Sequence, residues 1–137
     1  MAAELLVDSK IEFSKQLAKE LTERGAPLLA VYWEFHEEVD RWTLMLVPSS
    51  PEDQHRLIKE ATSLLVQPPY RSAFSVSDPL IDAHQIERAK ALGAYIRVQP
   101  YVGRRIDTMF TGGEYFEKVV PVYFKPELLT RLAVAPS

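Results

Sequence analysis

The sequence predicts a single α+β domain in which a mixed, largely antiparallel sheet packs against helices. Two stretches, 28–47 and 104–124, each contain a pair of segments that alternate apolar and polar residues, as the strands of a β-hairpin do. Other segments carry apolar residues at helical spacing. A chain of 137 residues without a repeat or linker fits one domain. We therefore expect one domain over 1–137, ordered helix, hairpin, helix, strand, helix, hairpin, with helices on one face of the sheet as the simplest arrangement.

The first helix is predicted over residues 9–24. Ser9 and Glu12 have the spacing of a capping box, in which each side chain bonds the other residue's backbone amide. Gly25 offers a left-handed C-cap, and Pro27 cannot continue a helix. The helix should therefore end before these two residues.

The first hairpin joins a strand over 28–35 to a strand over 42–47. A turn of four or five residues fits, because no glycine occupies the tip. In that register Phe35 lies opposite Trp42, and Trp33 lies opposite Leu44. Alternation places the aromatic residues mainly in the core and the acidic residues at the solvated tip. The first face holds Leu29, Val31, Trp33 and Phe35, and the second holds Ala30, Tyr32, Glu34 and His36.

The middle of the chain is predicted as helix, short strand and helix. Residues 50–53 have a capping serine, then proline and two acids, which together favour a helix start. Pro68 and Pro69 end that helix, and a short strand is expected over 73–76. Asp78 and Pro79 repeat the cap-plus-proline pattern at the start of a third helix.

The third helix is expected to reach Leu92, with Gly93 as its C-cap. Residues 94–103 are ambiguous, because 95–98 reads as a short strand and the rest as a loop. The closing hairpin is clearer. Gly112-Gly113 joins 104–111 to 114–124, and both turn residues can take positive φ. The predicted pairs are Phe110 with Tyr115, Ile106 with Val119, and Asp107 with Lys118.

The end of the chain is predicted as an edge strand that frays into a tail. Pro121 and Pro126 cannot donate a ladder hydrogen bond, which is typical of an edge strand. Residues 127–137 are expected to form a flexible tail.

Three short motifs resemble a small uncharacterised α+β domain of bacterial proteins. The chain departs from that domain by having Gly112 where asparagine is usual. The resemblance covers residues 30–124 and implies the fold, but no activity, because none is established for that domain. The motifs are Asp40-Arg41-Trp42-Thr43-Leu44, Ser77-Asp78-Pro79-Leu80 and Gly112-Gly113-Glu114-Tyr115-Phe116-Glu117.

Composition narrows the classes of function. The chain has no cysteine, which excludes disulfides, thiolate metal sites and thiol nucleophiles. We expect a cytoplasmic protein, because the first ten residues do not form a signal peptide and no apolar run is long enough for a membrane helix. The net charge of −3 disfavours general nucleic-acid binding, but residues 67–137 carry a net charge of +2.

The leading functional hypothesis is a non-catalytic protein that binds another protein or a second copy of itself. Tyr32, Met45 and Val47 share the hairpin face opposite the two tryptophans. If helices cover only one face of the sheet, this apolar face is exposed and marks an interaction surface. The alternative is that helices cover both faces, or that the first helix packs there.

Two further hypotheses use charged residues. Arg97, Tyr101, Arg104 and Arg105 combine arginine and an aromatic ring, as nucleic-acid or nucleotide sites do. Glu34 and His36 share a strand face and could ligate a metal, but no third ligand is fixed beside them. A metal-dependent hydrolase would need clustered acids, and Asp107, Glu114 and Glu117 do not converge in the expected register. We therefore expect no cofactor, no bound metal and no catalysis.

Overall fold

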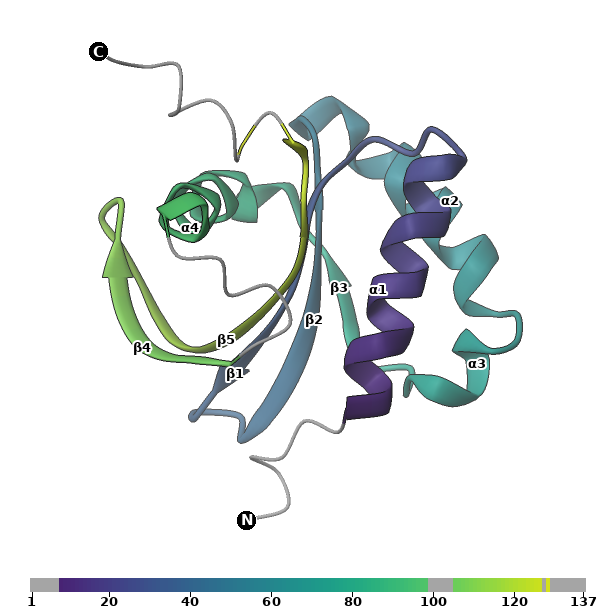
Figure 1. Ribbon diagram of the computed structural model, residues 1–137. Helices are drawn as coiled ribbons and strands as arrows, with labels where there is room; N and C mark the ends of the chain where they lie inside the picture. Colours follow the sequence, from purple (N-terminus) through teal and green to yellow (C-terminus); the bar gives the residue numbers. More distant parts are fainter. Residues whose placement is uncertain (1–7, 99–104, 127, 129–137) are drawn as a thin grey trace.

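A five-stranded mixed sheet lies between two layers of helices (Figure 1). The computed structural model describes residues 8–98, 105–126 and 128. The strand order is β3-β2-β1-β5-β4, antiparallel except for the parallel pair β2–β3. The strands are β1 (Leu28–His36), β2 (Arg41–Pro48), β3 (Pro79–Ile81), β4 (Ile106–Thr111) and β5 (Glu114–Phe124). The predicted α+β class is confirmed.

Helices cover both faces of the sheet, so the expectation of a single covered face is wrong. In Figure 1, α1, α2 and α3 lie on one side, and α4 lies on the other, inside the curve of β4 and β5. The helices are α1 (Asp8–Glu23), α2 (Gln54–Leu65), α3 (Tyr70–Ala73) and α4 (Ile86–Val98), with 3₁₀ turns η2 (Pro51–Asp53) and η3 (Ala83–Gln85) ahead of α2 and α4.

Helix α1 has the predicted C-terminus but a different start. It begins at Asp8, so Ser9 lies inside the helix and is not its cap. At the other end Gly25 adopts φ 75°, and the amide of Ala26 donates to the carbonyl of Leu21 at 3.0 Å. The amide of Gly25 donates to the carbonyl of Thr22 at 3.0 Å, which completes a Schellman motif.

The first hairpin has the predicted register, with Phe35 opposite Trp42 and Trp33 opposite Leu44. One face assignment is wrong, because the ladder is irregular between Leu28 and Ala30. The extra residue shifts Leu29 to the opposite face, where it packs with Ala30 on the α4 side of the sheet.

Two separate cores result from this alternation. The first core lies between the sheet and α1–α3, and Trp33 is its largest fully buried side chain. The indole Nε1 of Trp33 donates to the hydroxyl of Ser14 at 3.1 Å, so the buried N–H is satisfied. The second core lies between the sheet and α4 and includes Tyr32, Met45 and Phe116. Strand β1 is therefore buried on both faces.

The segment between the hairpins differs most from prediction. The strand predicted over 73–76 is absent, because residue 73 ends α3 and 74–76 belong to a loop, and the short strand lies later, at β3. Pro79 therefore begins a strand and not a helix. The cap of the next helical segment is Asp82, whose Oδ1 accepts from the amide of His84 at 2.9 Å. That hydrogen bond is the first cause of a lowered Asp82 pKa.

Helix α4 continues through Gly93 to Val98, so Gly93 is not a C-cap and 95–98 is not a strand. Glycine fits this position because α4 crosses the end of β5 closely. An added Cβ would lie 3.3 Å from Phe124 and 3.4 Å from Leu128. The close approach, and not the end of the helix, accounts for the missing side chain.

The closing hairpin has the predicted turn and register. Gly112 and Gly113 adopt φ 58° and 82°, and the three predicted cross-strand pairs are all present. Strand β5 is not an edge, however, because it pairs with both β1 and β4. Pro121 is accommodated beyond the last β4 pair, next to an irregularity in the β1 ladder. The predicted tail over 127–137 lies outside the described residues, apart from the buried Leu128.

Candidate functional site

The predicted interaction surface on the first hairpin is buried. Tyr32, Met45 and Val47 are 0%, 3% and 0% exposed, because α4 covers them. The rings of Tyr32 and Phe124 stack with centroids 6.2 Å apart, which fills the space between strand and helix. The prediction that these residues are available to a partner is therefore wrong, and the alternative of two covered faces holds.

A buried ion pair lies on the same face of the sheet. Glu34, predicted to be near the solvated tip, has a side chain only 2% exposed. Both of its carboxylate oxygens accept from the Arg88 guanidinium, at 2.8 Å each. Arg88 also donates to the carbonyl of Tyr115 at 2.6 Å and lies 4.2 Å above the ring of Phe116. The arginine therefore joins α4 to both β1 and β5.

Burial and the charge of Glu34 both affect the pKa values of Arg88 and Tyr32. Burial acts to lower the pKa of Arg88, but the hydrogen bond and negative charge of Glu34 raise it above its ordinary value. Burial also raises the pKa of Tyr32, and the charge of Glu34 adds to that effect. The hydroxyl of Tyr32 makes no hydrogen bond to any other described residue. This geometry fits a structural polar network inside the second core, because Glu34 is fully engaged by its arginine.

The predicted metal ligands and the hairpin acids do not form a common site among the described residues. His36 Nε2 lies 3.8 Å from Glu34, and no three acidic, histidine or cysteine residues of the described chain form a metal-ligand group. The hairpin acids diverge, as expected. Asp107 pairs with Arg105 at 2.8 Å, Glu114 lies 3.5 Å from Arg88, and Glu117 accepts from the amide of Glu37 at 2.8 Å.

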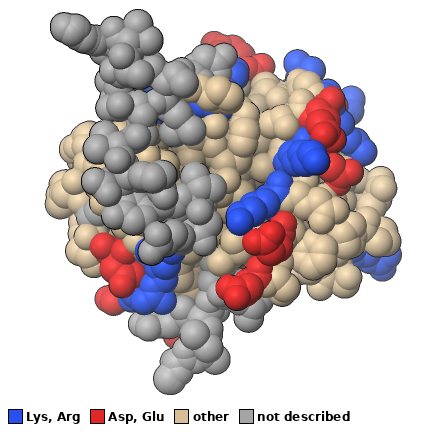
Figure 2. All heavy atoms as spheres, in the orientation of Figure 1, with Lys and Arg blue, Asp and Glu red and all other residues tan. Residues whose placement is uncertain are grey.

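The arginine cluster is only partly described. Arg105 is exposed, and its Nε donates to Asp107 at 2.8 Å. The side chain of Arg97, and the residues Tyr101 and Arg104, lie outside what the structure describes. Figure 2 shows acidic and basic side chains interleaved over the helical side of the face drawn there. Nucleic-acid or nucleotide binding therefore stays a prediction.

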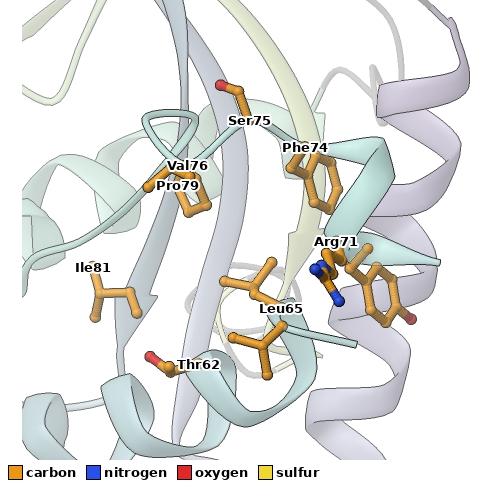
Figure 3. Close-up of a pocket in the computed structure, with 10 residues that line it drawn as sticks. Thr62, Leu65, Arg71, Phe74, Ser75, Val76, Pro79 and Ile81 are labelled. Carbon is orange, nitrogen blue, oxygen red and sulfur yellow. The ribbon is translucent and has the colours of Figure 1, made fainter. Parts of the chain in front are cut away.

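A pocket that sequence reasoning missed lies at the β3 edge of the sheet, and we call it the edge pocket (Figure 3). Its volume is about 650 Å³. Helix α2, helix α3, the loop after α3 and strand β3 each contribute part of its wall, and the lining is mostly apolar. The lining residues are Thr62, Leu65, Val66, Tyr70, Arg71, Phe74, Ser75, Val76, Pro79 and Ile81.

The walls of the edge pocket are anchored in the first core. Tyr70 and Phe74 stack with centroids 6.3 Å apart, and Phe74 lies 6.0 Å from the ring of Trp33. The hydroxyl of Tyr70 donates to Glu20 of α1. Burial raises the pKa of Tyr70, and this hydrogen bond raises it further. The aromatic wall is therefore held from behind by α1 and β1.

Asp78 holds the loop that forms the outer wall. Its Oδ2 accepts from the amide of Ser75 at 2.9 Å and from Lys10 Nζ at 2.8 Å, and its Oδ1 accepts from the Ser75 hydroxyl at 3.0 Å. The carbonyl of Asp78 accepts from the amide of Leu44 at 2.7 Å, which ties the loop to β2. Asp78 is only 8% exposed, so it shapes the pocket and is not a helix cap.

The rim of the edge pocket exposes apolar side chains. Val76 is fully exposed and Val66 is 58% exposed. Exposed apolar groups around a concave, mostly apolar surface are typical of a ligand site. In the sequence, Val66 lies two positions before Pro68-Pro69 and Val76 lies between two serines, and each is an apolar residue at a turn. That is the local signal from which the site could have been suspected.

Comparison with known proteins finds no match to this chain among known families, curated proteins or solved structures. Among the described residues, no helix has the length and apolar character needed to cross a membrane.

Proposed function

We propose that the protein binds a small amphipathic molecule in the edge pocket. The observation that carries this proposal is a mostly apolar pocket of about 650 Å³ with an exposed apolar rim. Pockets for small molecules have volumes of roughly 300–1,000 Å³ and combine apolar walls with few polar groups. Thr62 and Arg71 supply such groups here.

The surroundings of the pocket support binding without large rearrangement. Asp78 closes the outer loop through three hydrogen bonds, and stacked Tyr70 and Phe74 form a wall backed by Trp33. A site that is already shaped loses less conformational entropy when a ligand enters. Binding an apolar ligand would also cover Val66 and Val76, whose exposure costs free energy in water.

A titration with octan-1-ol, followed by methyl ¹H–¹³C spectra, tests the proposal. At about 0.5 kcal/mol per non-hydrogen atom, this probe should bind with a dissociation constant near a millimolar. We expect saturable shifts at Leu65, Val66 and Ile81, with Met45 and Val47 in the second core as internal controls. Shifts spread evenly over both sets of methyl groups, or no shifts at all, would contradict the proposal.

Association with a second copy is a second candidate, which a different surface favours. Phe110 is 73% exposed and Tyr115 is 48% exposed, with ring centroids 5.6 Å apart at the tip of the β4–β5 hairpin. Exposed aromatic pairs of this kind are enriched at protein interfaces. Sedimentation of the protein and of Phe110→Ser over a range of concentrations tests this candidate. A dimer that Phe110→Ser dissociates supports it, and a concentration-independent monomer removes it.

A further inference from the structure

We infer that the ligand of the edge pocket carries a carboxylate, which Arg71 binds at the rim. This inference rests on the proposed function and adds the chemical class of the ligand. Arg71 lines the pocket from α3 and is exposed. Figure 3 draws Arg71 among the side chains that line the pocket, together with the apolar Phe74 and Leu65.

The guanidinium of Arg71 has no partner within the described part of the chain, since no hydrogen bond or ion pair reaches it there. Several other described arginines are engaged, although Arg41 is not among them. Arg24 donates to Ser63 at 3.3 Å, and Arg88 and Arg105 pair with carboxylates at 2.8 Å. An arginine with its donors unused beside an apolar cavity can bind an anion without first breaking an internal bond.

The charges around the pocket favour an anion over a cation. Among the described residues that line the pocket, Arg71 alone carries a formal charge. Asp78, which holds the outer loop, is paired with Lys10 Nζ at 2.8 Å, and Glu20 lies behind the aromatic wall, where it accepts from Tyr70. Arg71 is therefore the charge that a head group at the rim meets, and a cationic head group would find no compensating acid in the described lining.

The number of donors favours a carboxylate over a phosphate. A single planar guanidinium matches a carboxylate with two parallel hydrogen bonds. A phosphate at neutral pH carries up to two negative charges and more acceptor oxygens. In the part of the chain that the structure describes, no second basic side chain lines the pocket. The assigned class is therefore a molecule with an apolar body and one carboxylate.

Four probes with eight carbon atoms each separate these head groups. Octanoate, octan-1-ol, octylamine and octyl phosphate would be titrated into the full chain, with dissociation constants taken from the methyl shifts of Leu65 and Ile81. We expect octanoate to bind about fivefold more tightly than octan-1-ol, because an exposed ion pair contributes up to about 1 kcal/mol. The preference should shrink at high salt, which screens exposed charges.

Arg71→Gln should abolish the preference for octanoate over octan-1-ol. Arg41→Gln is the matched control, because Arg41 is also exposed but lies at the start of β2, outside the pocket lining. This control should keep the preference while making the same change in net charge. Both side chains are exposed, so both variants should fold, as near-UV circular dichroism would show.

Each result decides the proposal. Equal binding of octanoate and octan-1-ol, or tighter binding of octyl phosphate or octylamine, would overturn the carboxylate assignment while the proposed function stands. A preference for octanoate over octan-1-ol that persists in Arg71→Gln would also overturn the carboxylate assignment and leave the proposed function standing. If none of the four probes shifts the pocket methyl groups, the proposed function fails and the carboxylate assignment fails with it.

Discussion

At the scale of single residues, the Arg88 guanidinium compensates a carboxylate that the sheet has buried. Removing one partner of a buried ion pair leaves the other charged and unsolvated. We therefore expect Arg88→Met to lower the free energy of unfolding by about 3 kcal/mol, as measured by urea denaturation. The loss should exceed that of an exposed control such as Arg41→Met, whose side chain is exposed on the first hairpin.

The double variant Glu34→Leu, Arg88→Met separates charge from packing. With both charges gone, no buried carboxylate remains unpaired, and most of the lost stability should return. A double variant no more stable than Arg88→Met would show that the arginine acts through its contacts with Phe116 and Tyr115, and not through Glu34.

The sequence could not reveal this pair. Glu34 and Arg88 are separated by 54 positions, and nothing local distinguishes Glu34 from the other acids near the hairpin tip. Strand alternation did place Glu34 on the face of Tyr32. What alternation cannot show is that α4 covers that face, because this depends on the path of the chain after β3.

At the scale of elements, the turn of the closing hairpin lies close against α4. A Cβ on Gly112 would lie 2.7 Å from the Cβ of Ala91 in α4, whereas a Cβ on Gly113 would meet nothing within 4 Å. Both residues have positive φ, so alanine is strained at either position. The close approach of Ala91 and the positive φ together favour glycine at position 112.

The two glycines therefore give a matched pair of variants. We expect Gly113→Ala to cost about 1 kcal/mol from backbone strain alone. Gly112→Ala should cost about 1–3 kcal/mol more, because the hairpin must also move away from α4. Thermal or urea unfolding measures both. Equal losses of unfolding free energy in the two variants would mean that a Cβ at position 112 does not clash with α4.

Both hairpins were predictable because their signals are local. Alternation and a turn of suitable length set the pairs Phe35–Trp42 and Phe110–Tyr115 without knowledge of the rest of the fold. The elements of segment 66–98 were not predictable in the same way. A capping residue followed by proline, as at Asp78-Pro79, fits either a helix start or a turn before a strand. The outcome there depends on β3 pairing with β2, a non-local contact.

At the scale of the whole molecule, stability and binding should depend on different side chains. Met45 lies in the second core, while Val76 is fully exposed on the rim of the edge pocket. We expect Met45→Ala to cost about 2–5 kcal/mol in unfolding free energy and to leave octan-1-ol affinity unchanged at temperatures where it is folded. Val76→Ala should leave the unfolding free energy unchanged and weaken octan-1-ol binding about threefold.

The reverse pattern would contradict this separation. If Val76→Ala destabilised the fold, the loop after α3 would be part of the core. If it left binding intact, the rim would not contact the probe. Denaturation and the methyl titration, carried out on the same two variants, distinguish these results.

Apart from the apolar Val66 and Val76 at turns, the sequence does not reveal the edge pocket, because its wall comes from four separate elements. Leu65 and Ile81 each look like an ordinary apolar position of a helix or strand, and α3 was not predicted at all. The overall class was predictable, since element order and hydrophobic pattern suffice for it. A concave surface arises only when α2, α3 and β3 are placed together.

The most direct test of the edge pocket as a binding site is a crystal structure of the protein grown with octanoate. We expect the alkyl chain of octanoate between Phe74 and Ile81, with the carboxylate oxygens on the guanidinium of Arg71. Octanoate bound on another surface, with only solvent between α2, α3 and β3, would contradict the claim that this pocket is the ligand site.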